Sequence, residues 1–342
     1  MSNTCGQRTK EERRAWLKQA QGYPLKLKVE LTRARIREWY NANKGEVFGA
    51  LSGGKDSDVM MDIIWSLYPD VPAVFADTGN ELQSVIDRVD RLIADGRPVI
   101  KVKPKYTFTE IVKRWGYPVI SKEQSGFIHE LRTTSSPDLA QTRWLGNKWG
   151  RGKISEKWKF VVNAPFKTTH NCCKHLKINP TAVYQKETGK VPFVGTMAQE
   201  SQLRMQSFIK YSCNAFDQKS PASRPIMFWT EQDVLQYVIE NNLPIAKAYG
   251  DVVGESGDRK CSGINRTGCK FCLFGVHLEK GENRIQRLAR VEPESYRYAI
   301  EELGYDKVMD FLGVPWQPFV TPDMQTDMFD ERYEVPAESL ND

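Results

Sequence analysis

The sequence predicts an α/β fold, with an open, mostly parallel sheet and flanking helices, and three observations favour this class. Short apolar segments suited to buried strands occur at 47–51, 71–76 and 98–102. Amphipathic segments of helical length separate them, and a glycine-rich turn directly follows the first. Strands that alternate with helices indicate βαβ units, in which ligands bind at the carboxyl ends of the strands.

The other elements are expected from local patterns. Basic amphipathic helices precede the first strand, 107–190 is a mostly helical insertion, and strands return at 191–194 and 225–229. Thr230 and Asp233 are typical of a capping box that opens a helix. The expected helices lie at 9–20, 26–43, 57–68, 80–95, 230–240 and 281–312, and a loop is expected at 250–268. Three regions are expected: a basic helical extension at 1–44, a nucleotide-binding α/β domain at 45–250, and a cysteine-bearing loop and helical region at 251–342.

The composition is that of a globular protein, because 40% of the 342 residues are hydrophobic and 27% are charged. No apolar run reaches the roughly 18 residues that a membrane span needs. The first residues show no apolar signal segment, so we expect a cytoplasmic protein with no membrane partner. The net charge of +6 is unevenly spread, since residues 1–40 hold ten Lys or Arg against four Glu. Local positive fields are therefore expected.

The segment Ser52-Gly-Gly-Lys-Asp-Ser57 lies between the first strand and the next helix. Its paired glycines let backbone N–H groups turn toward an anion, the helix N-terminus adds its dipole, and Lys55 adds a full charge. A Walker A loop is one alternative, because 49–55 fits its spacing, but Asp56 stands where that loop has Ser or Thr. An incidental glycine-rich turn is the other. We expect a phosphate-binding loop.

This loop resembles the SGGxDS segment of the PP-loop ATP pyrophosphatases, also called adenine nucleotide α-hydrolases. Within that superfamily the chain is most similar to the phosphoadenosine phosphosulfate (PAPS) reductase domain family. Stand-alone relatives of this kind are typical of phages, mobile elements and some CRISPR-associated loci. Three further segments carry the resemblance: Asp77-Thr-Gly79, Gly195 to Arg204 with Glu200 and Ser201, and Pro225 to Val234 with Trp229 and Asp233.

The resemblance implies ATP and Mg2+ as ligands. Asp56 is the implied magnesium ligand, and Lys55 and Arg204 would neutralise charge during transfer. For Glu200 and Arg204 the alternative is a surface ion pair, because they are spaced i and i+4. The candidate catalytic residues are Lys55, Asp56, Ser57 and Arg204, and the candidate nucleotide-binding residues are Ser52, Gly53, Gly54, Lys55, Asp56, Ser57, Asp77, Thr78, Gly79 and Glu200.

Five of the seven cysteines form a second candidate site. Cys172-Cys173 and Cys269-x-x-Cys272 resemble the ligands of the [4Fe-4S] cluster in the adenylylsulfate branch of the family. Thiolates are soft ligands that suit iron–sulfur clusters or zinc. We expect the two pairs to hold a [4Fe-4S] cluster, with zinc or buried inert cysteines as alternatives. Cys261 stays open as a substitute ligand or a free thiol, because its spacing to Cys269 resembles that of DNA-phosphorothioation sulfur-transfer enzymes.

Two departures distinguish the chain from the sulfonucleotide reductases that it resembles. Those enzymes use a catalytic cysteine in an E-C-G-x-H segment near the C-terminus, whereas the last cysteine here is Cys272. Their loop is degenerate, whereas Lys55 and Asp56 are intact. The resemblance implies that ATP is cleaved to AMP and pyrophosphate and that an acceptor is adenylated for sulfur transfer. The alternatives are PAPS or adenylylsulfate reduction and a non-catalytic nucleotide-binding accessory of a nucleic-acid complex.

A basic and aromatic stretch at 143–177 indicates nucleic acid as the acceptor. Cations for phosphates and flat rings for stacking suit a single strand, so tRNA or DNA is the expected partner, together with a sulfur-donor protein. The alternative is a solvated basic face whose aromatic residues enter the core. The stretch holds nine Lys or Arg against Glu156 alone, interleaved with Trp144, Trp149, Trp158, Phe160 and Phe166.

Overall fold

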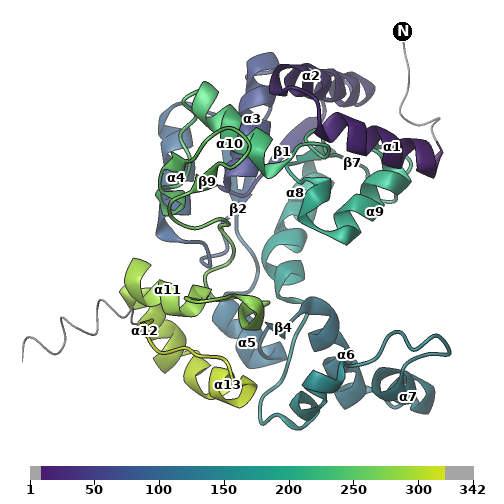
Figure 1. Ribbon diagram of the computed structural model, residues 1–342, viewed down its shortest axis with the longest axis vertical. Helices are drawn as coiled ribbons and strands as arrows, with labels where there is room; N and C mark the ends of the chain where they lie inside the picture. Colours follow the sequence, from purple (N-terminus) through teal and green to yellow (C-terminus); the bar gives the residue numbers. More distant parts are fainter. Residues whose placement is uncertain (1–8, 320–342) are drawn as a thin grey trace, which may run out of the picture. The chain divides into compact units, whose positions relative to one another are not determined.

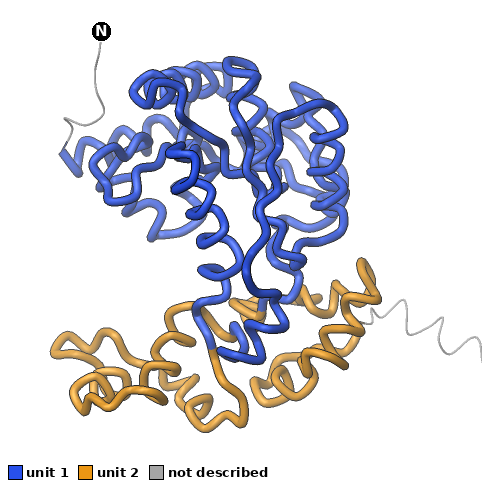
Figure 2. Tube along the Cα trace, turned by 180° about the vertical axis from the view of Figure 1, so that it is seen from behind, with its two compact units in different colours: residues 1–118, 169–272 blue, residues 119–168, 273–342 orange. Residues whose placement is uncertain are grey.

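A computed structural model describes residues 9–319 (Figure 1). The chain divides into two compact units (Figure 2). Unit 1 runs up to Pro118 and resumes over Thr169–Cys272, and unit 2 contains Val119–Thr168 and the residues from Leu273 onward. Both candidate sites therefore lie in unit 1, whereas the 107–190 insertion contributes to both units.

The sheet of unit 1 is open and mostly parallel, which confirms the predicted fold class. Its six strands have the order β3-β2-β1-β5-β7-β6, and only the β6–β7 pairing is antiparallel. The strand that precedes the phosphate loop, β1, pairs with β2 on one side and β5 on the other. The strands are β1 Val47–Leu51, β2 Ala73–Ala76, β3 Val99–Val102, β5 Val191–Val194, β6 Asn214–Ala215 and β7 Ala222–Ser223.

The helices of unit 1 follow the predicted pattern within a few residues. The Thr230–Asp233 capping box is present at the start of α10 (Glu231–Glu240). Asp233 also forms a 2.6 Å ion pair with the buried amine of Lys28, which anchors α2 (Leu25–Ala42) to α10. The remaining helices of unit 1 are α1 Lys10–Gln21, α3 Lys55–Leu67, α4 Gln83–Ala94, α5 Phe108–Trp115, α8 Asn179–Thr188 and α9 Gln202–Tyr211.

The prediction of a strand at 225–229 is wrong. This segment is a buried turn in which the Met227 N–H donates to the Arg224 carbonyl at 3.1 Å and the Trp229 N–H donates to the Ile226 carbonyl at 3.0 Å. Residues 226–229 are all almost fully buried. A short run that is apolar on every side does not distinguish a strand from another buried segment, because it carries no period. The neighbouring strand, β7, ends just before this turn.

The described residues of unit 2 are mainly helical, as predicted for 281–312. The short strand β4 (Val119–Ile120) pairs in parallel with β10 (Leu273–Phe274) and links its two chain segments. The helices are α6 Lys122–Thr133, α7 Pro137–Leu145, α11 Arg284–Val291, α12 Pro293–Glu301 and α13 Tyr305–Leu312, with a 3-10 segment at Glu156–Asn163. Between residues 9 and 319, no helix is both long enough and apolar enough to cross a membrane.

Candidate nucleotide and cysteine sites

The phosphate loop lies where strand order reverses in the sheet. The chain proceeds from β1 to β2 and β3 in one direction and then returns to β5 on the other side of β1. In open α/β sheets, ligands bind at the carboxyl ends of the strands beside such a reversal. The loop after β5 reaches the same place, because a Cβ added at Gly195 would lie 3.0 Å from Ser57 Cα. The sheet therefore brings two of the predicted segments together.

The loop backbone requires glycine at its first turn. Gly53 has a φ of +67°, and a Cβ there would lie 2.5 Å from the Val85 side chain. A hydrogen-bond network within the loop fixes its shape. The Ser52 N–H donates to Ser57 Oγ at 3.1 Å, and Ser57 Oγ donates to the Gly54 carbonyl at 2.8 Å. Helix α3 begins at Lys55, so its N-terminal N–H groups and dipole lie at this turn, an arrangement that suits an anion.

Lys55 is the buried cation of this site, with a side chain that is only 1% exposed. Its amine lies 3.1 Å from Asp56 Oδ1 and 2.9 Å from Glu231 Oε1. Burial alone would lower the pKa of Lys55, but the Asp56 and Glu231 carboxylates outweigh burial and raise it. The Lys55 N–H donates to the Tyr249 hydroxyl at 3.2 Å, and that hydroxyl lies 2.9 Å from the Thr267 hydroxyl. The lysine therefore stays charged and is held from several directions.

Carboxylates gather around Lys55. Burial raises the pKa of Asp56, the neighbouring Lys55 partly offsets this rise, and Glu231 and Glu200 raise it further. Oxygen ligands of this type, together with phosphate oxygens, are what Mg2+ prefers. Glu231 and Glu200 reach Asp56 from separate segments, the start of α10 and the turn after β5. The donor set thus fits a divalent cation held together with a polyphosphate.

Glu200 and Arg204 form an ion pair, which was the alternative considered for them. Glu200 also raises the pKa of Asp56, and its Oε1 accepts the Met197 N–H at 2.8 Å. Arg224 lies near Arg204, and burial together with the Arg204 charge lowers the pKa of Arg224. Among the described residues, its buried Nη1 has no hydrogen-bond partner. Two neighbouring guanidinium groups, one with an unpartnered buried nitrogen, suit an anionic ligand.

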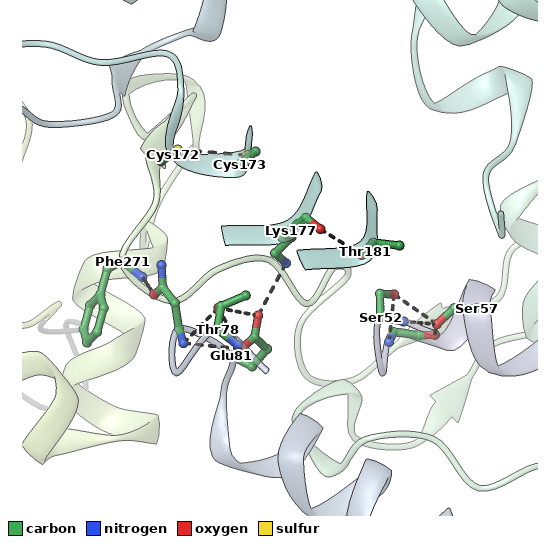
Figure 3. Close-up of polar contacts among 11 residues, drawn as sticks. Ser52, Ser57, Thr78, Glu81, Cys172, Cys173, Lys177, Thr181 and Phe271 are labelled. Atoms are coloured by element: carbon green, nitrogen blue, oxygen red, sulfur yellow. Dashed lines mark hydrogen bonds and ion pairs between the residues drawn. The ribbon is translucent and has the colours of Figure 1, made fainter. Parts of the chain in front are cut away.

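The Asp77-Thr-Gly79 segment follows β2, as predicted, and forms a tight loop (Figure 3). Thr78 is buried, and its hydroxyl donates to Glu81 Oε1 at 2.8 Å, so this side chain holds the loop itself. Gly79 has a φ of +70°, with open space around it. Asn80 connects the loop to the second cysteine pair: its carbonyl accepts the Lys270 N–H at 2.8 Å and its Oδ1 accepts the Phe271 N–H at 3.0 Å.

The four cysteines of the two pairs lie close to one another. Cys172 Sγ and Cys173 Sγ are 4.0 Å apart. The hydrogen bond with Cys173 raises the pKa of Cys172 most, followed by burial and by Cys173, Cys272 and Cys269. Burial raises the pKa of Cys269 to about 11, although Lys177 opposes the rise. The sequence expectation that these two pairs form one group is thus consistent with their placement.

Lys177 is the cation of the cysteine site. Burial alone would lower its pKa, but Cys269 and Glu81 outweigh burial and raise it. Its amine lies 3.5 Å from Glu81 Oε1, and Figure 3 marks this ion pair with a dashed line. Lys177 lies on a π-helical turn, Lys174–Ile178, that starts directly after Cys173. π-helical turns are rare in proteins, and those that occur are often found at functional sites. The turn therefore places a positive charge against thiols and a carboxylate together.

Cys261, on the short strand β9 (Lys260–Cys261), lies near the phosphate loop. Burial raises its pKa most, and the charges that act on it are those of Lys55, Glu231 and Asp56. The groups that act on Cys261 thus lie at the phosphate loop, and the two pairs remain the candidate ligands predicted from the sequence.

The thiols of the two cysteine pairs are soft donors, of the kind that suits an iron–sulfur cluster or zinc. In the described ranges, no three His, Cys, Asp or Glu side chains converge as ligands of one metal ion. The fully buried Asn80 also has a side-chain N–H group, Nδ2, with no partner among these residues. Such a donor suits a cluster sulfur.

Comparison with known proteins identifies the family. A family model described as the phosphoadenosine phosphosulfate reductase domain matches residues 46–119 and 143–269. The chain belongs to this family. The match covers the phosphate loop, the Asp77 segment and three of the four candidate cysteine ligands, and it ends at Cys269. The family assignment therefore agrees with the resemblance inferred from the motifs.

Individual relatives of this PAPS reductase family member are distant. An uncharacterized 37.8 kDa protein of Escherichia phage 186 is 28% identical over 253 residues, which are 68% of this chain and 67% of the phage protein. An adenosine 5'-phosphosulfate reductase of Geobacillus sp. (strain WCH70) is 26% identical over 201 residues, 59% of this chain and 66% of that protein. A phosphoadenylyl-sulfate reductase structure from Candida auris is 15% identical, with a TM-score of 0.35, and covers 75% of this chain and 92% of its own.

Several residues of the site were not predicted from the sequence. The sequence places Glu231 only at the start of a helix and Lys177 only in a basic stretch. Thr267 stands in the segment 250–268, for which the sequence predicts a loop, and Tyr249 directly precedes it. No local pattern distinguishes Arg224. The one available signal was the position of Lys177, four residues after Cys173, since a cation close to paired thiols offsets their charge.

Proposed function

We propose that the chain binds ATP at the phosphate loop and cleaves it between the α- and β-phosphates, releasing pyrophosphate and adenylating an acceptor. The observation that carries this proposal is the buried Lys55, held between Asp56 and Glu231 at the point where strand order reverses. A turn rich in N–H donors beside a fixed cation and clustered carboxylates is suited to a magnesium-bound polyphosphate. The family contains named enzymes, which supports an enzymatic role.

In the proposed reaction, an acceptor oxygen attacks the α-phosphorus, the bond from this phosphorus to the bridging oxygen breaks, and pyrophosphate leaves with the bond electrons. Loop N–H groups near Gly54 and the N-terminus of α3 hold the phosphates. The charges of Lys55, Arg204 and Arg224 would stabilise the negative charge that builds on the leaving group. Mg2+, when bound, would link phosphate oxygens to the Asp56 carboxylate and its neighbours.

The second proposed step is sulfur transfer. A sulfide ion, delivered by a donor protein, displaces AMP from the adenylated acceptor, so that a carbon–sulfur bond forms as the carbon–oxygen bond breaks. This step needs no net oxidant or reductant. Cys172, Cys173, Cys269 and Cys272 would hold a [4Fe-4S] cluster, which when bound supplies a soft site for sulfide. Lys177 would offset negative charge there, and nucleic acid is the proposed acceptor.

Sulfonucleotide reduction is the second candidate, favoured by the relatives that are named adenosine 5'-phosphosulfate reductases. Such a reaction would release sulfite and AMP and would consume two electrons from a thiol donor. Within this sequence, the residues that follow Cys272 include no cysteine. The two functions therefore differ in the product released as well as in the substrate consumed.

Product analysis separates the candidates. The protein is incubated anaerobically with magnesium and α-labelled ATP, with and without tRNA or DNA, and in parallel with adenylylsulfate or PAPS and a thiol. We expect AMP from ATP, lost in Asp56→Ala and Ser57→Ala. Ser66→Ala is the matched control, because Ser66 lies on the same helix and donates only to the Ile63 carbonyl. Sulfite without ATP cleavage would establish the reductase instead. ATP binding with neither product would leave a nucleotide-binding accessory and refute the proposal.

A further inference from the structure

Unit 2 carries a concentrated positive charge on the segment 139–168. Seven Lys or Arg stand there against one acidic residue, Glu156. Glu156 is engaged by Lys159 at 2.9 Å and by Lys153 at 3.9 Å, and Arg143 pairs with Glu130 of α6. The other four cations have no carboxylate within ion-pair distance among the described residues: Lys148, Arg151, Lys157 and Lys167. These four cations are therefore not neutralised by carboxylates in the described part of the chain.

The loop 146–152 holds its shape through its own hydrogen bonds. The Asn147 side-chain Oδ1 accepts both the Trp149 N–H and the Arg151 N–H at 3.0 Å. The Arg143 guanidinium donates to the Gly152 carbonyl at 2.7 Å. Gly146 has a φ of +98°, and a Cβ there would lie 2.9 Å from the Gly150 backbone. Three positive-φ glycines (146, 150 and 152) thus fold the loop tightly without placing any of its side chains in a core.

This ordered loop displays tryptophan to solvent. Trp149 is 70% exposed and Trp144, at the end of α7, is 42% exposed. Lys148 Nζ lies 4.3 Å from the centroid of the Trp149 ring, and Lys159 Nζ lies 4.5 Å from that of Trp144. The alternative that these rings enter the core holds for Trp158, which is 6% exposed, and not for the other two. Helix α7 itself has no buried residue.

Exposed tryptophans with lysine amines over their rings restrict the kind of partner. A polyanion alone needs only the charges, and an apolar partner needs only the rings. Single-stranded nucleic acid uses both, because its phosphates attract Lys and Arg while its unpaired bases stack on aromatic side chains. A duplex offers the phosphates but keeps its bases stacked inside, and an acidic peptide offers no succession of flat rings.

We propose that the tryptophan surface, defined as Trp144, Trp149, Lys148 and Arg151, binds single-stranded nucleic acid. Bases stack on the open faces of the two indoles, and the two cations contact the adjoining phosphates. Single-stranded nucleic acid would then be the acceptor of the proposed function. The binding itself does not depend on that function, whereas any reaction of the bound strand rests on it. Single-stranded RNA and DNA share the required groups.

Fluorescence anisotropy tests this proposal with the full-length protein and labelled 20-nucleotide strands of RNA, of DNA, and of the same DNA as a duplex. We expect binding to single strands, weakened about tenfold or more by Trp149→Ala and largely restored in Trp149→Tyr, which keeps a stacking ring. Leu278→Ala is the matched control, because Leu278 is an exposed apolar residue of the same unit, at 72% exposure. The RNA and DNA arms identify which strand is preferred.

Salt dependence gives a second readout. The double variant Lys148→Gln with Arg151→Gln should reduce the log–log slope of affinity against salt by about 1.4, since each single-strand phosphate contact contributes about 0.7. Lys307→Gln, an exposed lysine on α13, should leave the slope unchanged.

Three results would overturn the proposal: no binding to any strand, duplex binding as tight as single-strand binding, or equal affinity for Trp149→Ala and the native protein. Circular dichroism checks that each variant is folded. Repeating the titration with Asp56→Ala and without ATP separates this surface from the nucleotide site. Binding that persists there while AMP formation is lost shows that the two proposals stand or fall independently.

Discussion

The buried ion pair between Asp58 and Arg88 joins the helix of the phosphate loop to the next helix, and its removal should show a strong pH dependence. Arg88 Nε lies 2.9 Å from Asp58 Oδ2, with the two side chains 6% and 0% exposed. Asp58 Oδ1 has no hydrogen-bond partner in the described part of the chain. Burial raises the pKa of Asp58 from 3.8 to about 6, although Arg88 opposes the rise.

The sign of the effect follows from this raised pKa. Between about pH 4 and pH 6 the folded protein binds a proton at Asp58 more tightly than the unfolded chain, so this group lowers the free energy of unfolding as pH rises. A shift of about two units corresponds to about 3 kcal/mol lost by pH 8. In Arg88→Met the Asp58 carboxylate loses its cation, but the folded variant can avoid a buried unpaired charge by protonating Asp58. Protonating a carboxyl whose unfolded pKa is 3.8 costs about 6 kcal/mol at pH 8 and about 1.6 kcal/mol at pH 5, and this cost is an upper limit for the variant.

The variant should therefore be less stable than the native protein by up to about 3 kcal/mol at pH 8 and by nearly nothing at pH 5, where Asp58 is already protonated in both. Urea unfolding followed by tryptophan fluorescence measures both values. The double variant Asp58→Asn with Arg88→Met is the control, because it has no carboxyl to titrate at this position. A destabilisation of equal size at both pH values would refute the reasoning.

Three further predictions concern the two sites. Gly53→Ala should destabilise the protein by more than about 1–2 kcal/mol, which is the cost of a left-handed backbone alone, because the added methyl also clashes with Val85. Gly79→Ala is the control in the same thermal melt: its φ is similar but the space around it is open, so it should cost only about 1–2 kcal/mol, that of the left-handed backbone. Cys269→Ser should lose anaerobically bound iron, whereas Cys261→Ser should retain it in an iron assay, and equal loss would contradict the division of the cysteines. Glu231→Gln should lower the rate of AMP formation about tenfold or more through Lys55, and an unchanged rate would remove Glu231 from the site.

The sheet was predictable where the chain alternates between buried strands and amphipathic helices. The strands at 47–51 and 191–194 coincide with their predicted ranges, since apolar segments bounded by helices and turns leave little ambiguity. The segment 225–229 failed because its burial comes from all sides and shows no period of two. The local sequence pattern therefore predicts an element when its buried and exposed faces differ in polarity. It does not distinguish a strand from a turn when the whole segment is buried.

The site was predictable only where its residues are contiguous. The order of residues 52–57 predicted a turn, a helix start and a lysine, all of which are local properties. Glu231 reaches Lys55 across 176 positions, and Tyr249 reaches it across 194. Nothing in the local sequence of either residue distinguishes it from a surface glutamate or a core tyrosine. Such partners are defined by the order of strands in the sheet, which spacing along the chain does not reveal.

The arrangement after β2 explains why nucleotide chemistry and cysteine chemistry are proposed as parts of one reaction. Asn80 follows the strand next to β1 in the sheet, and it binds the backbone of both Lys270 and Phe271. The loop between Cys269 and Cys272 is therefore held at the carboxyl end of β2, the strand that pairs with the strand preceding the phosphate loop. Lys177 adds a second connection, because its pKa is raised both by Cys269 and by Glu81, which follows β2. Neighbouring strand ends thus support both candidate sites, which is the structural basis for proposing that they serve one reaction.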